Sequence, residues 1–371
     1  MEKQRQSNFE LLRIILMIAI PIYHLMLYGG MNNLPYNQLT VPSLLICSGS
    51  AIVADYAFMA LSAYFLLDVK NKPVISRFLK LAIQVLFIYL LKMLVLRMVL
   101  HIDGTNVLFE AFLVEGSWWF IYVYFIILII YPFFNKVIFT CHVSVICRIC
   151  IVLGIFFVLN GITYNVNLFN DLLCFVFTYF VIGYLKRNNF KTYFGLKNKK
   201  ITLISIYIVG YIITFLTCLY VKWPEVLNNN DLSSEIIRRI VGKYSFIQFV
   251  MGVAVFLLFR SITIKTNKWI NDIAKNTFYV FLLHETVMAI YWCNDKLKIV
   301  DDVVPYKDVF SLVGWSFIYI VSSFVFAYMI RKVYELLLNK TVSNGIRWIC
   351  EGSFIKKIES QYSKILQDKE V

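Results

Sequence analysis

The chain has 371 residues, of which 60% are hydrophobic, 17% aromatic and only 16% charged. Its mean hydropathy of +0.71 is far above that of a soluble domain of this length, which excludes an ordinary soluble protein and indicates a polytopic membrane protein. The formal net charge is +14. A soluble chain so basic would suggest nucleic acid, but here the basic residues follow the loops between apolar segments, so we expect no nucleic-acid partner.

Ten apolar segments are long enough, or nearly so, to cross a bilayer. They cover residues 9–28, 43–67, 78–100, 118–134, 143–159, 172–185, 201–221, 245–259, 277–292 and 310–330. The sixth and eighth are shorter than the ~20 residues that span a hydrocarbon core, so they must extend into their flanks or lie inside the bundle. We predict an all-α bundle of about ten transmembrane helices in one domain, residues 1–340, because no clear repeat or long linker divides it.

Lysine and arginine residues alternate between loops along the chain. Most of the 36 lie in the N-terminal tail, after the even-numbered segments and in the C-terminal tail, whereas the first three of the remaining loops have none. The positive-inside rule therefore places both termini in the cytoplasm, Arg13 near the cytoplasmic face and His24 in the outer half. The expected location is the cell membrane.

The tail of residues 341–371 is predicted to be cytoplasmic. Between residues 346 and 366, basic side chains mix with apolar ones, which favours an amphipathic helix on the anionic inner leaflet. A partly ordered, charged tail is the alternative.

Eight cysteines lie mostly within or beside apolar segments, and we interpret them as small packing residues rather than a disulfide framework. Cys141, His142, Cys147 and Cys150 stand close together in the chain. Their spacing matches no zinc pattern, so we predict no metal site.

Arg13 and His24 share the first apolar segment, with ten residues between them. Eleven helical steps of about 100° and 1.5 Å place the two side chains within roughly 20° of one face and about 16 Å apart along the axis. Ionisable groups inside a membrane helix are costly, so an aligned pair indicates function. The alternatives are a histidine satisfied by a neighbouring helix, and an arginine that pairs with Glu10 or with lipid phosphate.

Five phrases carry a family resemblance and occur in the family's order. They are SNFELLRIILMIAIPIYH, FMALSAYFLLD, SRFLK, SWWFIYVYFIILIIYPFFNKVI and INDIAKNTFYVFLLHE. In the first phrase, ten residues separate an arginine from a histidine, as in the family. Together the phrases span residues 7–285. In these phrases the chain resembles the acyltransferase 3 family, multi-pass membrane enzymes that acylate, most often acetylate, cell-surface glycans and other extracytoplasmic acceptors.

Three positions depart from the family's pattern. Ala63 stands where the family has a glycine after Ser62, and Lys80 replaces the second arginine of its Arg-x-x-Arg entry to the third segment. Six residues before Ser62, where the family has Asp or Asn, this chain has Tyr56, with Asp55 beside it. Either the helix is shifted by one residue, which gives the role to Asp55, or the role has moved. Ser62 has no nucleophile motif around it and is expected to pack helices.

The resemblance implies acyl-coenzyme A, most often acetyl-CoA, as a co-substrate, with no bound cofactor. Transfer from a thioester to a sugar hydroxyl needs a base, and we predict that His24 is that base, because an imidazole titrates near neutral pH. A covalent acyl-histidine relay is an open alternative. Arg13 would hold the phosphates of the donor by charge-assisted hydrogen bonds. Arg77 and Lys80, three residues apart on one helical face, would add phosphate contacts, unless they serve only the positive-inside signal.

Acceptor candidates lie on the predicted outer side. Glu115, Trp119 and Tyr122 combine a carboxylate with aromatic rings at the start of the fourth segment, although an interfacial aromatic belt explains the rings equally well. His284 and Glu285 are neighbours in the ninth segment and face different directions on a helix. One of them can therefore pair with His24 or with the acceptor.

The predicted function is a membrane acyltransferase that moves an acyl group from cytosolic acyl-CoA to a hydroxyl of an extracytoplasmic glycan. Its predicted partners are membrane lipid, acyl-CoA and a surface or lipid-linked glycan. The main alternative is a polysaccharide or glycolipid transporter, which also buries ionisable groups near the midplane. A transporter predicts internal repeats and broken helices at matching positions, and we find neither in the sequence.

Overall fold

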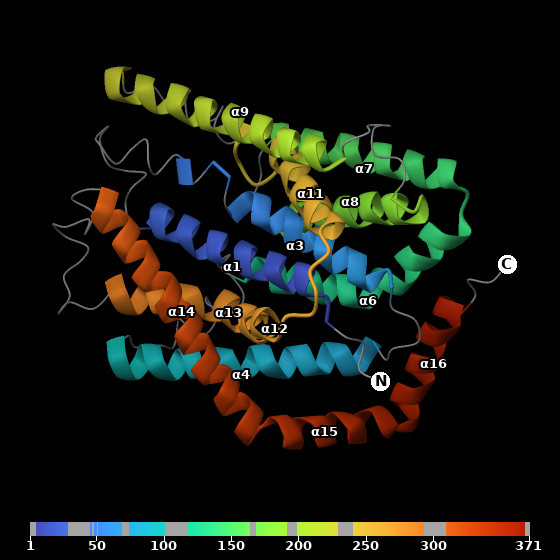
Figure 1. The fold of residues 1–371 in the computed structure, drawn as a ribbon. Coiled ribbons are helices and arrows are strands. Elements are labelled where there is room, and N and C mark those ends of the chain that lie inside the picture. The colour runs from blue at the N-terminus through green and yellow to red at the C-terminus, as the bar shows by residue number, and fades with distance from the viewer. Residues whose placement is uncertain are drawn as a thin grey trace.

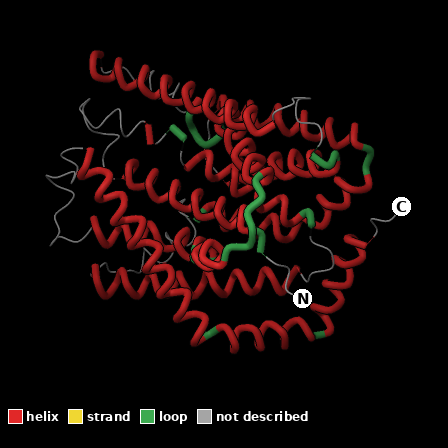
Figure 2. The backbone as a smooth tube through the Cα atoms, in the orientation of Figure 1, coloured by secondary structure: helices red, strands yellow, loops and turns green. Residues whose placement is uncertain are grey.

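The computed structural model describes most of the chain as helix (Figures 1 and 2). The described residues are 5–28, 45–46, 48–49, 51–68, 74–100, 118–163, 168–190, 199–228, 240–292 and 309–367. Within them the helices are α1 Ser7–Tyr28, α3 Ala51–Leu66, α4 Val74–Leu100, α6 Trp119–Thr140, α7 Val143–Thr163, α8 Leu168–Arg187, α9 Lys199–Asn228, α11 Phe246–Ser261, α12 Lys268–Ala274, α13 Thr277–Trp292, α14 Val309–Leu337, α15 Asn339–Glu351 and α16 Ser353–Gln367. The prediction of an all-helical membrane bundle is confirmed.

Each of the ten apolar segments coincides with a helix of the structure. Among the described residues, 7 helices are long and apolar enough to cross a membrane, namely α1, α4, α6, α7, α8, α9 and α14. The sixth segment, which is short in the apolar pattern, extends into its flanks as the 20 residues of α8. In contrast, α3, α11 and α13 have 16 residues each, so the count of ten crossings stays a prediction.

The bundle has a basic end, which we define by Arg77, Lys186 and Arg187. Arg77 lies in the first turn of α4, Lys186 pairs with Asp68 just after α3 (2.6 Å), and Arg187 donates to the carbonyl of Ile138 near the end of α6. In Figure 1, α1 and α4 begin, and α6 and α16 end, toward this same side. A chain that crosses a membrane an even number of times has both of its ends on the same side, as here. The positive-inside rule predicts that the basic end faces the cytoplasm, and we call the other end the outer end.

Helix α3 is short, apolar and packed on several sides. Its buried alanines recur at residues 51, 54, 57, 60 and 63, and it packs against α1, α8 and α11. At Gly252 of α11 an added Cβ would lie 2.5 Å from Cβ of Tyr56 and 2.7 Å from the carbonyl oxygen of Val53. Small residues allow helix backbones to approach closely in a membrane, where hydrophobic burial does not drive association. The small side chains therefore place α3 in the interior.

A polar contact at the basic end of the interior joins three helices. Asn135 of α6 is fully buried; its amide donates to the carbonyl oxygen of Leu66 (3.1 Å), and it accepts from the hydroxyl of Tyr179 in α8 (2.7 Å). A buried amide without partners would cost several kcal/mol in an apolar interior, roughly 2–7. These bonds therefore fix α6 against α3 and α8.

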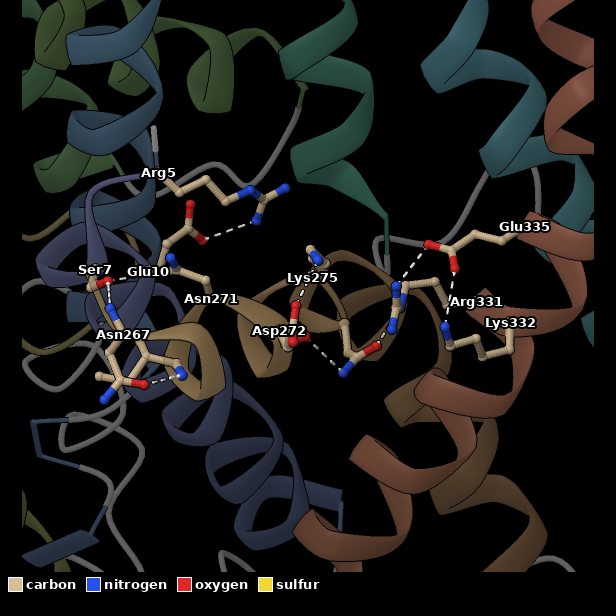
Figure 3. A network of polar contacts seen from close by, with 12 residues as sticks. Arg5, Ser7, Glu10, Asn267, Asn271, Asp272, Lys275, Arg331, Lys332 and Glu335 are labelled. Atoms are coloured by element: carbon tan, nitrogen blue, oxygen red, sulfur yellow. Dashed lines mark hydrogen bonds and ion pairs between the residues drawn. The ribbon is translucent and has the colours of Figure 1, made fainter. Parts of the chain in front are cut away.

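A second polar network fastens short helix α12 at the basic end (Figure 3). The hydroxyl of Ser7, in the first turn of α1, donates to the side chain of Asn271 (3.0 Å) and accepts from the backbone N–H of Asn267 (2.8 Å). Arg331 of α14, which is only 7% exposed, donates through Nε to Asn276 (2.7 Å). These contacts hold α12 and the start of α13 between α1 and α14.

The C-terminal tail forms two helices, α15 and α16, separated by Gly352. They contact α4 and α6, and Ile346 is buried whereas Trp348 and Phe354 are 78% and 71% exposed. The predicted amphipathic segment is therefore helical within the described residues. Its position on a lipid surface stays a prediction.

Candidate active site

A cavity of about 260 Å³ lies between α1, α3, α4, α6 and α13. Four polar side chains line it: Arg13, Asp55, Ser62 and Thr277. The remaining lining residues are Met17, Ile20, Phe58, Leu81, Phe120, Ile121, Tyr124, Phe278 and Phe281. This volume is slightly below the usual range for small-molecule sites. A mostly apolar cavity of this size suits a narrow chain that carries a few polar groups.

One stripe of α1 faces the cavity. Arg13, Met17 and Ile20 line it, and His24 continues the same i, i+4, i+7, i+11 series one turn farther. The stripe rises about 10 Å from Arg13 to Ile20 at 1.5 Å per residue. Pro21 lies on this stretch of the helix and has no N–H to donate back to the preceding turn. Arg13 thus lines the cavity, whereas His24 lies just beyond its outer part and is not among its lining residues.

Helix α3 runs in the opposite direction along the cavity. Phe65, near its end, lies 5.6 Å from the guanidinium of Arg13. Asp55 and Ser62 both line the cavity and are seven residues, about two turns, apart. Asp55 therefore marks the outer part of the cavity and Ser62 the part near Arg13. Tyr56, which stands six residues before Ser62, is buried, and its hydroxyl donates to the carbonyl oxygen of Lys243 (2.6 Å).

The ring of His24 lies against that of His284 from α13. Nδ1 of His24 is 2.8 Å from Nε2 of His284, and the rings are stacked with centroids 5.0 Å apart and an interplanar angle of 15°. His284 is fully buried, and its backbone carbonyl accepts from the hydroxyl of Tyr319 in α14 (2.9 Å). Two histidines 260 positions apart in the chain are therefore held in direct contact just beyond the outer part of the cavity, and neither of them lines it.

The surrounding acceptors decide which nitrogen carries each proton. Nδ1 of His284 lies 2.7 Å from the carbonyl oxygen of Phe281 and 3.1 Å from that of Val280. A carbonyl can only accept, so this nitrogen is protonated, and Nε2 of a neutral His284 is an acceptor. The bond between the rings is then donated by Nδ1–H of His24. This tautomer makes Nε2 the basic nitrogen of His24.

Arg13 pairs with Glu10, as the alternative to a functional role predicts, and it also lines the cavity. Its Nη1 is 3.5 Å from a carboxylate oxygen of Glu10, and Arg5 lies 3.6 Å from the same oxygen. The side chain of Arg13 stays 34% exposed. A pair at this distance and exposure is weak. It leaves Arg13 able to bind an anion at the basic end of the cavity.

Arg77 and Lys80 are not brought together at the cavity. Arg77 donates to the hydroxyl of Tyr131 in α6 and lies 5.3 Å from the centre of its ring. Lys80 is exposed. Neither lines the cavity, although the next residue, Leu81, does. Their proposed phosphate contacts thus depend on a ligand that extends beyond the cavity at the basic end.

Trp119 contacts a charged pair that the sequence interpretation missed. Nζ of Lys243 lies 3.4 Å from the centre of the Trp119 ring and 2.8 Å from Oδ1 of Asp171. Asp171 is only 3% exposed. Its position in the first turn of an apolar helix is a signal that could have identified it, because buried carboxylates in membrane segments are uncommon. Tyr122 packs half-buried against the core and does not line the cavity.

Two predicted residues cannot be assigned a contact. Glu115 lies outside the described residues, and so does the side chain of Glu285, whose backbone belongs to α13.

A family model described as an acyltransferase domain, that of the acyltransferase 3 family, matches residues 6–332. Neither the curated proteins nor the solved structures yield a match. The matched range includes the whole cavity, both paired histidines and the Lys243–Asp171 pair, and it stops before α15. It covers nearly all of the membrane bundle and therefore favours an enzyme over a transporter. The chain belongs to the acyltransferase 3 family, and the protein is a membrane acyltransferase.

Proposed function

We propose that the protein transfers an acyl group, most often acetyl, from cytosolic acyl-CoA to a hydroxyl group of an extracytoplasmic glycan, in the cell membrane. The observation that carries the proposal is one side-chain stripe on α1. It presents Arg13 at the basic end of a cavity and His24, paired with His284, beyond the outer part. A cation for the donor and a base for the acceptor thus share one path through the bundle.

The donor enters from the basic end in this proposal. Arg13 binds a phosphate of the coenzyme by charge-assisted hydrogen bonds, with Arg77 and Lys80 as further contacts. The pantetheine arm then lies along the apolar part of the cavity. This arrangement brings the thioester toward Ile20 and Phe281, one helical turn from the two histidines.

The acceptor approaches from the outer end. Nε2 of His24 takes the proton of the sugar hydroxyl while its oxygen attacks the thioester carbonyl carbon. The carbon–sulfur bond breaks, the ester forms, and the coenzyme leaves as a thiol after it takes a proton from His24. The Nδ1–H bond to His284 persists through the cycle and orients the ring. Direct transfer needs one active base, whereas an acyl-histidine relay would need the same nitrogen as nucleophile.

A comparison of surface glycans tests this function. Glycan from a strain that lacks the protein is compared by NMR with glycan from the complemented strain, before and after mild base. We expect ester-linked acyl signals only in the complemented strain, and we expect mild base to remove them. Identical spectra from the two strains would exclude the glycan as acceptor.

Substitution of Arg13 tests the donor side. We expect Arg13→Gln to raise KM for acyl-CoA about tenfold with little change in acceptor KM, because a hydrogen bond to a charged group contributes roughly 1.5–3 kcal/mol. The measurement is thiol release from acetyl-CoA by the purified full-length protein.

Lys275→Gln is the matched control for Arg13→Gln. Lys275 is another cation of the basic end, but it does not line the cavity. It pairs with Asp272 at 2.6 Å, and this hydrogen bond lowers the pKa of the Asp272 carboxyl. Equal donor KM values for the two variants would show that Arg13 has no specific role in donor binding.

A further inference from the structure

A charged cluster adjoins the outer part of the cavity. Asp171 of α8 is buried, and its Oδ1 accepts from Nζ of Lys243 (2.8 Å) and from the hydroxyl of Tyr244 (3.0 Å). Lys243 is 21% exposed, and its ammonium also lies 3.4 Å from the centre of the Trp119 ring. The carboxylate therefore fixes the ammonium over the aromatic face, where both electrostatic attraction and the ring quadrupole stabilise it.

The cluster is connected to the cavity on two sides. Trp119 directly precedes Phe120, which lines the cavity. Tyr56 donates to the carbonyl oxygen of Lys243 (2.6 Å) and directly follows Asp55, which also lines the cavity. A molecule that reaches the outer part of the cavity therefore meets the Asp55 side chain next to the Lys243–Asp171 pair.

The composition of this group of residues indicates which ligands it accepts. Carboxylates accept hydrogen bonds from hydroxyl groups, and an ammonium donates to them. The positive charge of Lys243 is already matched by Asp171 at 2.8 Å, so the cluster offers no net positive charge to an anion. An anionic sugar would have to give up its hydration beside a pair that offers it no net positive charge, which is costly in a mostly apolar cavity.

We propose that the outer part of the cavity is an acceptor subsite for an uncharged, hydroxyl-bearing sugar unit, with Asp55 and Lys243 as its polar contacts and Asp171 as a positioning residue. This inference rests on the proposed acyl transfer and adds the class of acceptor. Because Lys243 covers one face of Trp119, the ring holds the ammonium in place, and the sugar does not stack on that face. A uronic acid or a phosphorylated sugar is selected against.

The test uses the purified full-length protein, acetyl-CoA and two soluble probes, methyl glucoside and methyl glucuronide. These probes differ in a single position, where the second has a carboxylate. Thiol release reports consumption of the donor, and mass spectrometry reports the acetyl ester. We expect kcat/KM for the glucoside to exceed that for the glucuronide by about tenfold or more, since the cost of removing the carboxylate from water opposes binding of the glucuronide.

Variants of the pair separate recognition from stability. We expect Lys243→Met to raise the acceptor KM for the glucoside about tenfold with the acetyl-CoA KM unchanged, and Lys243→Arg to recover part of this loss. The double variant Asp171→Asn with Lys243→Met removes both charges, so that no buried charge is left unpaired. It is expected to keep the raised acceptor KM while folding at least as well as Lys243→Met.

Lys186 is the matched control, because it repeats the same chemistry at the basic end. Its Nζ pairs with Asp68 (2.6 Å) and lies 4.6 Å from the centre of the Tyr64 ring, and none of these residues lines the cavity. Lys186→Met is expected to leave the acceptor KM unchanged. Equal use of the two probes, or equal acceptor KM values for Lys243→Met and Lys186→Met, would overturn the inference alone. Absence of thiol release with every sugar would overturn the proposed function and this inference with it.

Discussion

Replacement of His24 by alanine is expected to lower kcat about 10³-fold, within the range that general acid–base catalysis contributes. The loss has a specific origin, because the variant has no nitrogen at the position where Nε2 of His24 takes the hydroxyl proton. Donor KM should change little, since Arg13 is about 16 Å away along the same helix. Thiol release from acetyl-CoA in the presence of a sugar acceptor measures both quantities.

His142→Ala is the matched control for this substitution. His142 is an exposed histidine before α7 whose Nδ1 contacts Ser144 (2.8 Å). It lies outside the cavity, so its removal should leave kcat unchanged. If His24→Ala retained wild-type turnover while its membrane level matched that of His142→Ala, His24 would have no part in proton transfer.

The stripe on α1 was predictable from the sequence because it depends only on helical periodicity. Arg13 and His24 are eleven positions apart, and any α-helix places such residues on one side. The cavity wall confirms this geometry for Arg13, Met17 and Ile20. The function of Arg13 and His24 stays a prediction, because helical periodicity determines which way a side chain points and not which reaction it takes part in.

Contacts between distant segments were not predictable in the same way. The sequence names His284 and Glu285 as candidates to pair with His24 or with the acceptor, but it does not decide between them. The observed partner of His24, His284, is 260 positions away, and hydropathy alone does not specify which turn of α13 meets which turn of α1. The pairing depends on how α1 packs against α13, which only the fold determines. For the same reason the Lys243–Asp171 pair was missed, because its two residues belong to separate segments whose neighbours only the fold determines.

Asp55 and Tyr56 differ in where the structure places their side chains. Either Asp55 or Tyr56 could correspond to the family's polar position, and adjacent residues point in different directions on a helix. Asp55 lines the cavity, whereas Tyr56 bonds to the carbonyl of Lys243. Asp55 thus has the orientation that a one-residue shift requires, whereas the hydroxyl of Tyr56 is directed to the backbone of Lys243. The role of Asp55 stays a prediction.

Substitution of His284 is expected to have the second-largest effect, although the proposed mechanism gives this residue no contact with substrate. His284→Leu fills the buried site with an apolar side chain but removes the acceptor for Nδ1–H of His24. The His24 ring then loses the bond that selects its tautomer and orientation. Loss of the hydrogen-bond partner that orients a metal-bound histidine lowers activity about 10- to 100-fold. We expect a loss of similar size here, in kcat rather than in donor KM.

His284→Gln distinguishes orientation from simple packing. The amide oxygen of glutamine can accept a hydrogen bond, as Nε2 of His284 does, whereas leucine cannot. If the role of His284 is to accept from His24, the glutamine variant should recover about a tenth or more of wild-type kcat, although glutamine fits the buried site less well than leucine does. If the two variants were equally impaired, the loss would come from disturbed packing of α13 against α1. Measured kcat values for the two proteins at matched membrane levels therefore decide whether the histidine pair works as a hydrogen-bonded unit.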